Sequence, residues 1–233
     1  MKLSDFKGLF RRSALTLLKV ENPFDDYYRI TLKPGKDTVW HPGDHGVFTL
    51  PGRKVKGRSW RAFSVASIPQ ENTILIGTRT GENISGFKKE LTSMQEGDLV
   101  NVIGPFGWFK IQDDTSPIVL VAGGVGITPI RALLKQLEND TARPIELVFQ
   151  AKGHYLFGDE LLNMAIDNPK ITVQMTRSKE DSQKALDAIM AQHGNKAYYY
   201  ISGPRPFVKA NKKHIKQHSI PGSKIISDPF LGY

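Results

Sequence analysis

The fold of the second half of the chain is decided by one stretch, which runs Ile118-Val119-Leu120-Val121-Ala122-Gly123-Gly124-Val125-Gly126-Ile127-Thr128-Pro129. Its first part is apolar throughout, as expected of a strand buried on both faces of a parallel sheet. Glycines after such a strand let the backbone approach a ligand closely, and the N–H groups that open the next helix attract an anion. Residues 127–138 then have the apolar spacing of a helix. The order strand, glycine turn and helix predicts a nucleotide-binding unit, although close packing alone also requires glycines.

The glycine turn has the spacing G-x-G-x-x-P over Gly124, Gly126 and Pro129, where many dinucleotide sites have G-x-G-x-x-G. Proline suits this place because its φ is already that of a helix start. A second turn of the same kind, Ser202-Gly203-Pro204-Arg205, follows a later strand. Both turns fall at the carboxyl ends of strands, where open α/β sheets bind ligands. Taken alone, the second turn is equally well an ordinary tight connection.

Strands and helices alternate from this stretch to the end of the chain. Strands are expected at 118–122, 145–150, 171–176, 197–202 and 224–227, and helices at 127–138, 158–165, 182–193 and 205–218. This alternation predicts a doubly wound parallel α/β domain over residues 114–233.

The first half has a different pattern of short β-rich runs separated by turn residues. Strands are expected at 14–20, 27–32, 45–50, 60–67, 73–79 and 99–103, with one short helix at 85–92. We therefore expect an N-terminal antiparallel, six-stranded β-barrel over residues 1–113.

Composition limits the function. Lys and Arg number 32 against 23 Asp and Glu, a net charge of +9, but the cations are scattered and favour a solvated face or a small-anion site over nucleic acid. A nucleic-acid-binding barrel stays an alternative that leaves the α/β half unexplained. The absence of cysteine excludes disulfides, a cysteine nucleophile and cysteine-ligated clusters, and fits a cytoplasmic protein. We expect no metal site. We also expect no membrane span, because no apolar run approaches about 20 residues.

Several motifs in order resemble those of the ferredoxin–NADP reductase superfamily, whose members are FAD-binding FR-type oxidoreductases. They are Arg61-Ala62-Phe63-Ser64, Ile84-Ser85, Gly104-Pro105-Phe106-Gly107, the glycine turn, Ser202-Gly203-Pro204 and Asp228-Pro229-Phe230. The resemblance extends from about residue 14 to residue 233. The sequence of residues 63–67 further resembles that of the reductase domains of the ferric-reductase and NADPH-oxidase-like branch.

The resemblance implies a flavin site on the barrel. In it Arg61 binds the pyrophosphate of FAD, Phe63 stacks on the isoalloxazine ring and Ser64 hydrogen-bonds near N5. The helix start at Ser85 holds the pyrophosphate as well, and further flavin contacts come from Ala62, Val65, Thr78 and Ile84. From the residues alone, Arg61 would be a surface cation, Phe63 a barrel-core aromatic and Ser85 a helix N-cap.

The resemblance also implies a nicotinamide site on the second half, formed by Gly124, Gly126, Thr128, Pro129, Gly203 and Pro204. Ser202 would lie near the point of hydride transfer, where many relatives have cysteine, and Asp228 stands where the family usually has glutamate. Tyr233 would cover the flavin and swing away for hydride transfer, unless it is an unordered tail.

The third parallel strand is followed by Thr176-Arg177-Ser178-Lys179, a cluster of hydroxyls and cations that suits the 2′-phosphate of NADP rather than the free ribose of NAD. The simpler interpretation is that Arg177 and Lys179 are solvated loop cations. We expect NADPH to be preferred over NADH.

The activity implied by the resemblance is that of a flavin-dependent oxidoreductase. A hydride passes from C4 of NAD(P)H to N5 of FAD, and electrons then pass to a separate acceptor. That acceptor could be a ferredoxin, a flavodoxin, a haem protein, a membrane-associated reductase partner or a ferric chelate. The alternative is a non-catalytic flavin- or nucleotide-binding subunit of a larger electron-transfer complex.

Overall fold

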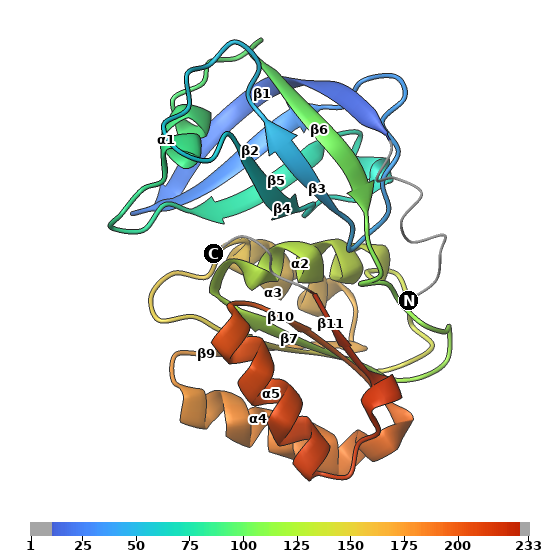
Figure 1. Ribbon diagram of the computed structural model, residues 1–233. Coiled ribbons are helices and arrows are strands. Elements are labelled where there is room, and N and C mark those ends of the chain that lie inside the picture. The colour runs from blue at the N-terminus through green and yellow to red at the C-terminus, as the bar shows by residue number, and fades with distance from the viewer. Residues whose placement is uncertain (1–10, 229–233) are drawn as a thin grey trace. The chain divides into compact units, whose positions relative to one another are not determined.

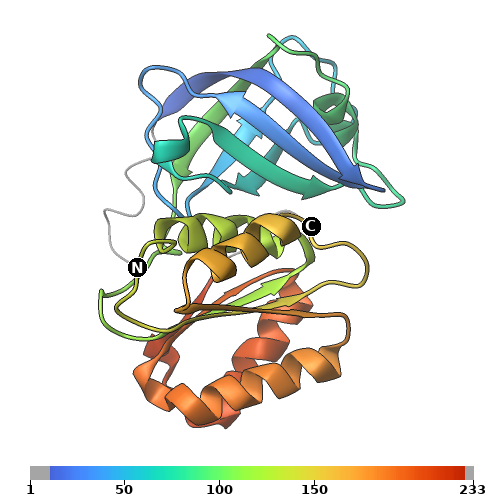
Figure 2. The ribbon, with the colours of Figure 1, turned by 180° about the vertical axis from the view of Figure 1, so that it is seen from behind.

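The structure is a computed structural model that describes residues 11–228 (Figures 1 and 2). The chain divides into two compact units between Lys110 and Ile111, three residues before the boundary expected from the sequence, and each unit is described by itself. Among residues 11–228, no helix has the length and apolar character needed to cross a membrane.

The first unit is an antiparallel sheet of six strands in the order β4-β3-β6-β1-β2-β5. The strands are β1 (Arg12–Phe24), β2 (Tyr27–Lys33), β3 (His45–Thr49), β4 (Trp60–Ser64), β5 (Ile74–Arg79) and β6 (Leu99–Phe106). The sheet curls, and its two edges meet where the Ala66 N–H donates to the Leu75 carbonyl at 2.8 Å. The predicted barrel is confirmed, with its edges joined just beyond β4. A short 3-10 turn, η2 (Pro69–Glu71), and the helix α1 (Gly86–Thr92) complete the unit.

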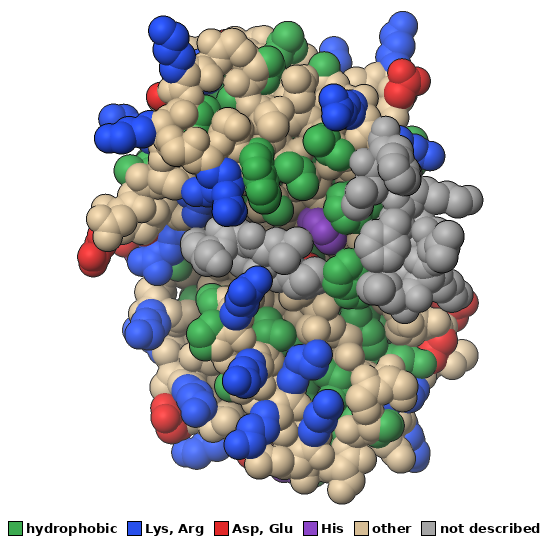
Figure 3. All heavy atoms as spheres, in the orientation of Figure 1, with side chains coloured by type: hydrophobic (Ala, Val, Ile, Leu, Met, Phe, Trp, Pro, Cys, Tyr) green, Lys and Arg blue, Asp and Glu red, His purple; other side chains and the backbone are tan. Residues whose placement is uncertain are grey.

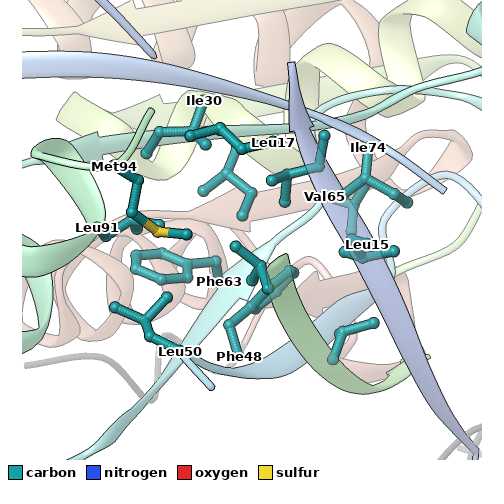
Figure 4. Packing of buried hydrophobic residues seen from close by; sticks show 14 of the residues in the cluster. Leu15, Leu17, Ile30, Phe48, Leu50, Phe63, Val65, Ile74, Leu91 and Met94 are labelled. Atoms are coloured by element: carbon teal, nitrogen blue, oxygen red, sulfur yellow. The ribbon is translucent and has the colours of Figure 1, made fainter. Parts of the chain in front are cut away.

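The interior of the curled sheet is filled by side chains that alternate along its strands. Leu15 and Leu17 of β1 and Ile30 and Leu32 of β2 are fully buried, and α1 adds Phe87 and Leu91. Figure 4 shows this core from close by. Burial of one such side chain contributes about 1.5–3 kcal/mol, so the core fixes which face of each strand points inward.

The second unit is a parallel sheet of five strands in the order β11-β10-β7-β8-β9, with helices on both faces. The strands are β7 (Ile118–Gly123), β8 (Ile145–Gln150), β9 (Ile171–Thr176), β10 (Tyr198–Ser202) and β11 (Ile225–Ser227). The helices are α2 (Ile127–Gln136), α3 (Gly158–Asp167), α4 (Lys179–His193) and α5 (Arg205–Gln217), with 3-10 turns η3 (Gly124–Gly126), η4 (Gly194–Lys196) and η5 (Gly222–Lys224). Helices α2 and α3 cover one face and α4 and α5 the other (Figures 1 and 2). The predicted doubly wound domain is confirmed.

The direction of winding reverses between β7 and β10. From β7 the chain moves through α2 to β8 on one side, whereas β10 pairs with β7 on the other side. A crevice opens at the carboxyl ends of the strands at such a reversal, and ligands of open α/β sheets bind there. Both glycine-containing turns follow these two strands, so the topology places them next to each other.

Helix α4 begins at Lys179, three residues before the start expected from the sequence. Ser178 is its N-cap: its hydroxyl oxygen accepts from the Asp181 N–H at 3.0 Å, and the hydroxyl donates to Asp181 Oδ2 at 2.7 Å. The apolar spacing starts only after this first turn, which explains why the sequence predicted a start three residues further along the chain. The hydroxyl–cation cluster is therefore the start of a helix.

Candidate functional site

The two turns at the winding reversal are packed backbone against backbone. A Cβ atom at Gly126 would lie 2.4 Å from the Ser202 carbonyl oxygen and 2.5 Å from the Cα of Gly203. At Gly123 and Gly203 a Cβ would meet the ring of Phe207 at 2.9 and 2.7 Å. Glycine is required at these three positions by the packing of the turns themselves.

Gly124 differs from its neighbours. Its φ is +54°, in the left-handed region that favours glycine, and a Cβ built there would meet no atom of residues 11–228 within 4 Å. Of the glycines in the turn, Gly124 is the one beside open space. A ligand that approaches the backbone of this turn can do so at Gly124.

A groove of about 300 Å³ lies where β8 ends and where α4 and α5 begin. It is lined by Gln150, Lys179, Ser182, Gln183, Pro206, Phe207, Ala210 and Asn211. Two helix starts bring the positive ends of their dipoles to it, and Lys179 adds a full charge. Arg177 is exposed just before α4. The apolar side of the groove and its cations together suit a ligand with a flat ring and phosphates, so the residues present fit a nicotinamide nucleotide.

Ser202 and Asp228 are brought together at the carboxyl ends of β10 and β11. The Ser202 hydroxyl donates to Asp228 Oδ2 at 3.3 Å, and the Asp228 N–H donates to the Ile201 carbonyl at 3.0 Å. Both side chains are buried. Ser202 and Asp228, which the sequence predicted as separate site residues, thus form one hydrogen-bonded pair. The carboxylate of Asp228 orients the hydroxyl of Ser202.

The other residues that the sequence predicted for the nucleotide site differ in their exposure to solvent. Thr128 is buried and its hydroxyl donates to the Val125 carbonyl at 2.9 Å, inside the first turn of α2. Pro129 is buried in the same turn, while Pro204 is exposed as the N-cap of α5. Thr176 Oγ1 is buried and has no hydrogen-bond partner among residues 11–228. Tyr233 lies outside the described residues.

The charges of two cations, Arg61 and Lys88, interact in the first unit. Burial, and secondly the nearby charge of Arg61, lower the pKa of Lys88 to about 8. The Lys88 ammonium donates to the Arg79 carbonyl at 2.6 Å, and Arg61 forms no ion pair with a carboxylate among residues 11–228. Asp26 opposes the shift, but its carboxylate is held by the Arg79 guanidinium at 2.8 Å. A bound anion would relieve this repulsion, so the site fits the pyrophosphate of FAD.

Ser85 is the N-cap of α1. Its hydroxyl oxygen accepts from the Lys88 N–H at 3.4 Å, and Gly86 packs so closely that a Cβ there would collide with the Lys56 carbonyl. The side chain of Ile84 is 40% exposed beside this helix start. The N-cap interpretation of Ser85 is confirmed, while its contact with a flavin stays a prediction.

Phe63 lies in the core of the first unit. Its ring centroid is 5.7 Å from that of Phe48 and 6.1 Å from that of Phe87, and Figure 4 shows it among core side chains. It faces inward because Phe63 and Phe48 project from the same side of the paired strands β3 and β4.

The neighbouring residues predicted to contact the flavin differ in exposure. Val65 and Thr78 are buried, Ser64 is 9% exposed and Ala62 is partly exposed. Stacking of Phe63 on a flavin stays a prediction. It requires that one face of the Phe63 ring become accessible to the ligand.

Sequence reasoning missed Lys88, Phe207 and Gln150. Lys88 has the sequence context of a surface cation, and only the closure of α1 onto the sheet buries it. Phe207 follows the second turn by a few residues and packs on two of the glycines. No residue pattern identifies such side chains, because their roles come from segments far apart in the sequence.

Comparison with known proteins agrees with this geometry. Residues 120–213 match the family described as the oxidoreductase NAD-binding domain. The reductase component of propane 2-monooxygenase from Mycolicibacterium goodii is 27% identical over 92% of this chain and 66% of its own length. The electron transfer component of toluate 1,2-dioxygenase from Pseudomonas putida is 26% identical over 81% of this chain and 58% of its own length. The chain therefore spans less than two thirds of the length of each of these relatives.

Solved structures share the fold of the whole chain. A ferredoxin–NADP reductase from Neisseria gonorrhoeae with bound FAD and NADP superposes with a TM-score of 0.78 at 16% identity, over 94% of this chain and 99% of that one. The chain therefore has the fold of the ferredoxin–NADP reductases. A cytochrome P450 reductase from Amycolatopsis shares this fold as well, with a TM-score of 0.79 at 21% identity over 94% of this chain and 70% of that one.

Proposed function

We propose that this chain is a member of the ferredoxin–NADP reductase superfamily, and that it is a flavin-dependent oxidoreductase that takes a hydride from NAD(P)H onto FAD and passes electrons to a separate acceptor. The observation that carries the proposal is the presence in one chain of two ligand-compatible sites. One is the pair of cations Arg61 and Lys88 in the first unit. The other is the groove at the starts of α4 and α5, whose lining residue Phe207 packs on the glycine turns. A non-catalytic subunit with the same ligands is the alternative.

In this proposal FAD supplies an electron acceptor for the hydride of NAD(P)H and can release electrons one or two at a time. The protein binds and orients. Arg61 and Lys88 neutralise the pyrophosphate of the flavin, the backbone at Gly124 admits the nucleotide, and Lys179 faces its phosphates. Asp228 holds the Ser202 hydroxyl in one orientation beside the second turn.

The test begins with the absorption spectrum of the purified protein. A yellow protein whose flavin is released by heat and identified by chromatography as FAD is expected, because FAD has a pyrophosphate where FMN has one phosphate. Anaerobic addition of NADPH or NADH should then bleach the flavin. Bleaching separates the enzyme from the non-catalytic subunit, while recovered FMN, or an absence of flavin even after reconstitution, contradicts the cofactor.

We propose further that the acceptor is an acidic electron-carrier protein. Helix α5 carries a basic stripe, and Figure 3 shows Lys and Arg side chains gathered over this part of the second unit. The stripe borders a hollow of about 750 Å³ and consists of Arg205, Lys209, Lys212, Lys213 and Lys216. Complementary charge speeds the encounter with an acidic protein. The cysteine-free sequence fits a cytoplasmic location, which is part of the proposal.

Arg177→Ala is expected to lower kcat/KM for NADPH about ten- to a hundredfold and to leave that for NADH nearly unchanged. Loss of one charge-assisted contact to the 2′-phosphate removes about 1.5–3 kcal/mol. The measurement is kcat/KM for both nucleotides. Lys184→Ala is the matched control, since Lys184 is an exposed cation of α4 outside the lining of the groove. Equal losses for both nucleotides, or a wild type that prefers NADH, would show that Arg177 does not bind the phosphate.

FAD binding is expected to weaken as the pH rises through about 8. The folded-state pKa of Lys88 lies near 8, below the ordinary 10.5, so its ammonium is charged below that pH and neutral above it. Loss of this cation beside the pyrophosphate should lower affinity about fivefold, or roughly 1 kcal/mol. Titration of the apoprotein with FAD at about pH 7 and about pH 9.5 measures the change. Lys88→Gln should remove the step, and an unchanged step in that variant would assign it to another group.

A further inference from the structure

Three potential metal ligands meet on the face of the second unit that α4 and α5 cover. His214 lies near the end of α5 and His218 is its C-cap, four residues later, so both rings project from one side. Asp187 comes from the neighbouring helix α4. Its Oδ1 atom lies 2.6 Å from Nε2 of His214 and 3.5 Å from Nε2 of His218. Two imidazoles thus converge on one carboxylate oxygen.

The backbone determines which nitrogen of His218 is available. Its Nδ1 lies 3.1 Å from the His214 carbonyl oxygen. A carbonyl oxygen only accepts, so Nδ1 carries the hydrogen and the neutral ring has its lone pair on Nε2. This lone pair faces the carboxylate oxygen of Asp187, so two acceptors lie opposite each other at 3.5 Å. A proton, a bridging water or a metal ion between them would satisfy both acceptors.

The spacing suits a metal ion. The three ligand atoms lie within 4.8 Å of one another. In a tetrahedral site with bonds of about 2.0–2.1 Å, ligand atoms are roughly 3.3–3.5 Å apart, so small side-chain rotations suffice. The side chain of His218 is 41% exposed and that of Asp187 44%, which leaves room for ion entry and for a water ligand. A hydrogen bond from the other ring nitrogen to a backbone carbonyl is the usual outer support of a metal-binding histidine.

We propose that Asp187, His214 and His218 bind one divalent transition-metal ion, Zn²⁺ or a similar ion, and that this ion clips α4 to α5. Imidazole nitrogens favour Zn²⁺, Co²⁺, Ni²⁺ and Cu²⁺, whereas Mg²⁺ and Ca²⁺ are held by oxygen ligands. The site offers a single carboxylate, and Lys213 and Lys216 are its neighbours along α5. A hard cation held by charge alone is therefore disfavoured here.

The site is tested with tag-free, chelator-treated protein titrated with ZnCl₂ and CoCl₂ by calorimetry and visible absorption. One equivalent should bind, Co²⁺ should develop visible absorption, and Zn²⁺ should raise the Tm. His218→Ala should bind at least about tenfold more weakly, since loss of even an outer partner of a ligand costs about ten- to a hundredfold. The exposed His218 decides the matter if His214→Ala does not fold. These readouts are independent of flavin and nucleotide.

His41→Ala is the matched control. His41 also pairs with a carboxylate, Asp44, at 3.4 Å, but it does not belong to a three-ligand group among residues 11–228. This variant should retain the affinity for Zn²⁺ and the rise in Tm. Wild type and His218→Ala with equal affinity, or MgCl₂ as effective as ZnCl₂, would overturn the proposal.

Discussion

Replacement of Arg61 by alanine is expected to lower the affinity for FAD about ten- to a hundredfold. A charge-assisted contact to phosphate contributes about 1.5–3 kcal/mol, and each 1.4 kcal/mol is about tenfold in affinity. No carboxylate among residues 11–228 competes for the Arg61 guanidinium, so its charge is available to an anion. Fluorescence titration of the apoprotein with FAD measures the loss. The same substitution should raise the pKa of Lys88, because one of the two causes that lower it disappears.

Arg53→Ala provides the control for this prediction. Arg53 belongs to the same unit, but its guanidinium is already paired with Asp98 at 2.6 Å and with Glu90 at 3.3 Å. Its removal changes the net charge equally and should leave FAD affinity nearly unchanged. An Arg61→Ala protein that purifies with full flavin content, or an equal loss in both variants, would show that Arg61 does not hold the pyrophosphate.

Gly126→Ala is expected to lower the free energy of unfolding by about 3 kcal/mol. The new methyl group would lie 2.4 Å from the Ser202 carbonyl oxygen and 2.5 Å from Gly203, and both neighbours are backbone that cannot rotate away. Overpacking of this kind typically costs about 1–3 kcal/mol and sometimes more. Urea denaturation measures the change. NAD(P)H binding should fall with it, because the two turns form one side of the proposed site.

Gly124→Asn separates packing from ligand contact. No atom of the described part of the chain lies within 4 Å of a Cβ at Gly124, and asparagine tolerates a positive φ better than other side chains, so we expect a stability loss of about 1 kcal/mol or less. Nucleotide binding should nevertheless weaken, because the side chain would enter the space left for a ligand. If Gly126→Ala were as stable as Gly124→Asn, the packing account of the two turns would be wrong.

Much of the fold could be predicted from local patterns. The strands at 145–150 and 171–176 have the bounds that the structure shows, and the apolar run before Gly123 is the central strand of the parallel sheet. Periodicity succeeds here because each strand and helix buries one face, and burial depends on residue spacing along a single element. The start of α4 was missed because the cap at Ser178 is polar and precedes the apolar spacing.

The candidate site could be predicted only in part. The glycine turns and the Ser202–Asp228 region were visible as motifs, but the hydrogen bond between those two side chains depends on the pairing of β10 with β11. Phe63 illustrates the opposite case, since its motif suggests a ligand contact and the inward face of β4 places it among core aromatics. Motifs record residue types, whereas accessibility is decided by the neighbouring strand.

The sequence by itself determined the two-part architecture, the order of its elements and the glycine-rich turns at the strand ends, because each of these depends on residues close together in the chain. Only the tertiary structure decided which glycine faces open space, which lysine is buried beside Arg61, and that Asp187 meets two histidines of α5. The physical reason is that distances between side chains from different elements follow from how sheets and helices pack. Packing joins residues whose separation along the chain carries no periodic signal.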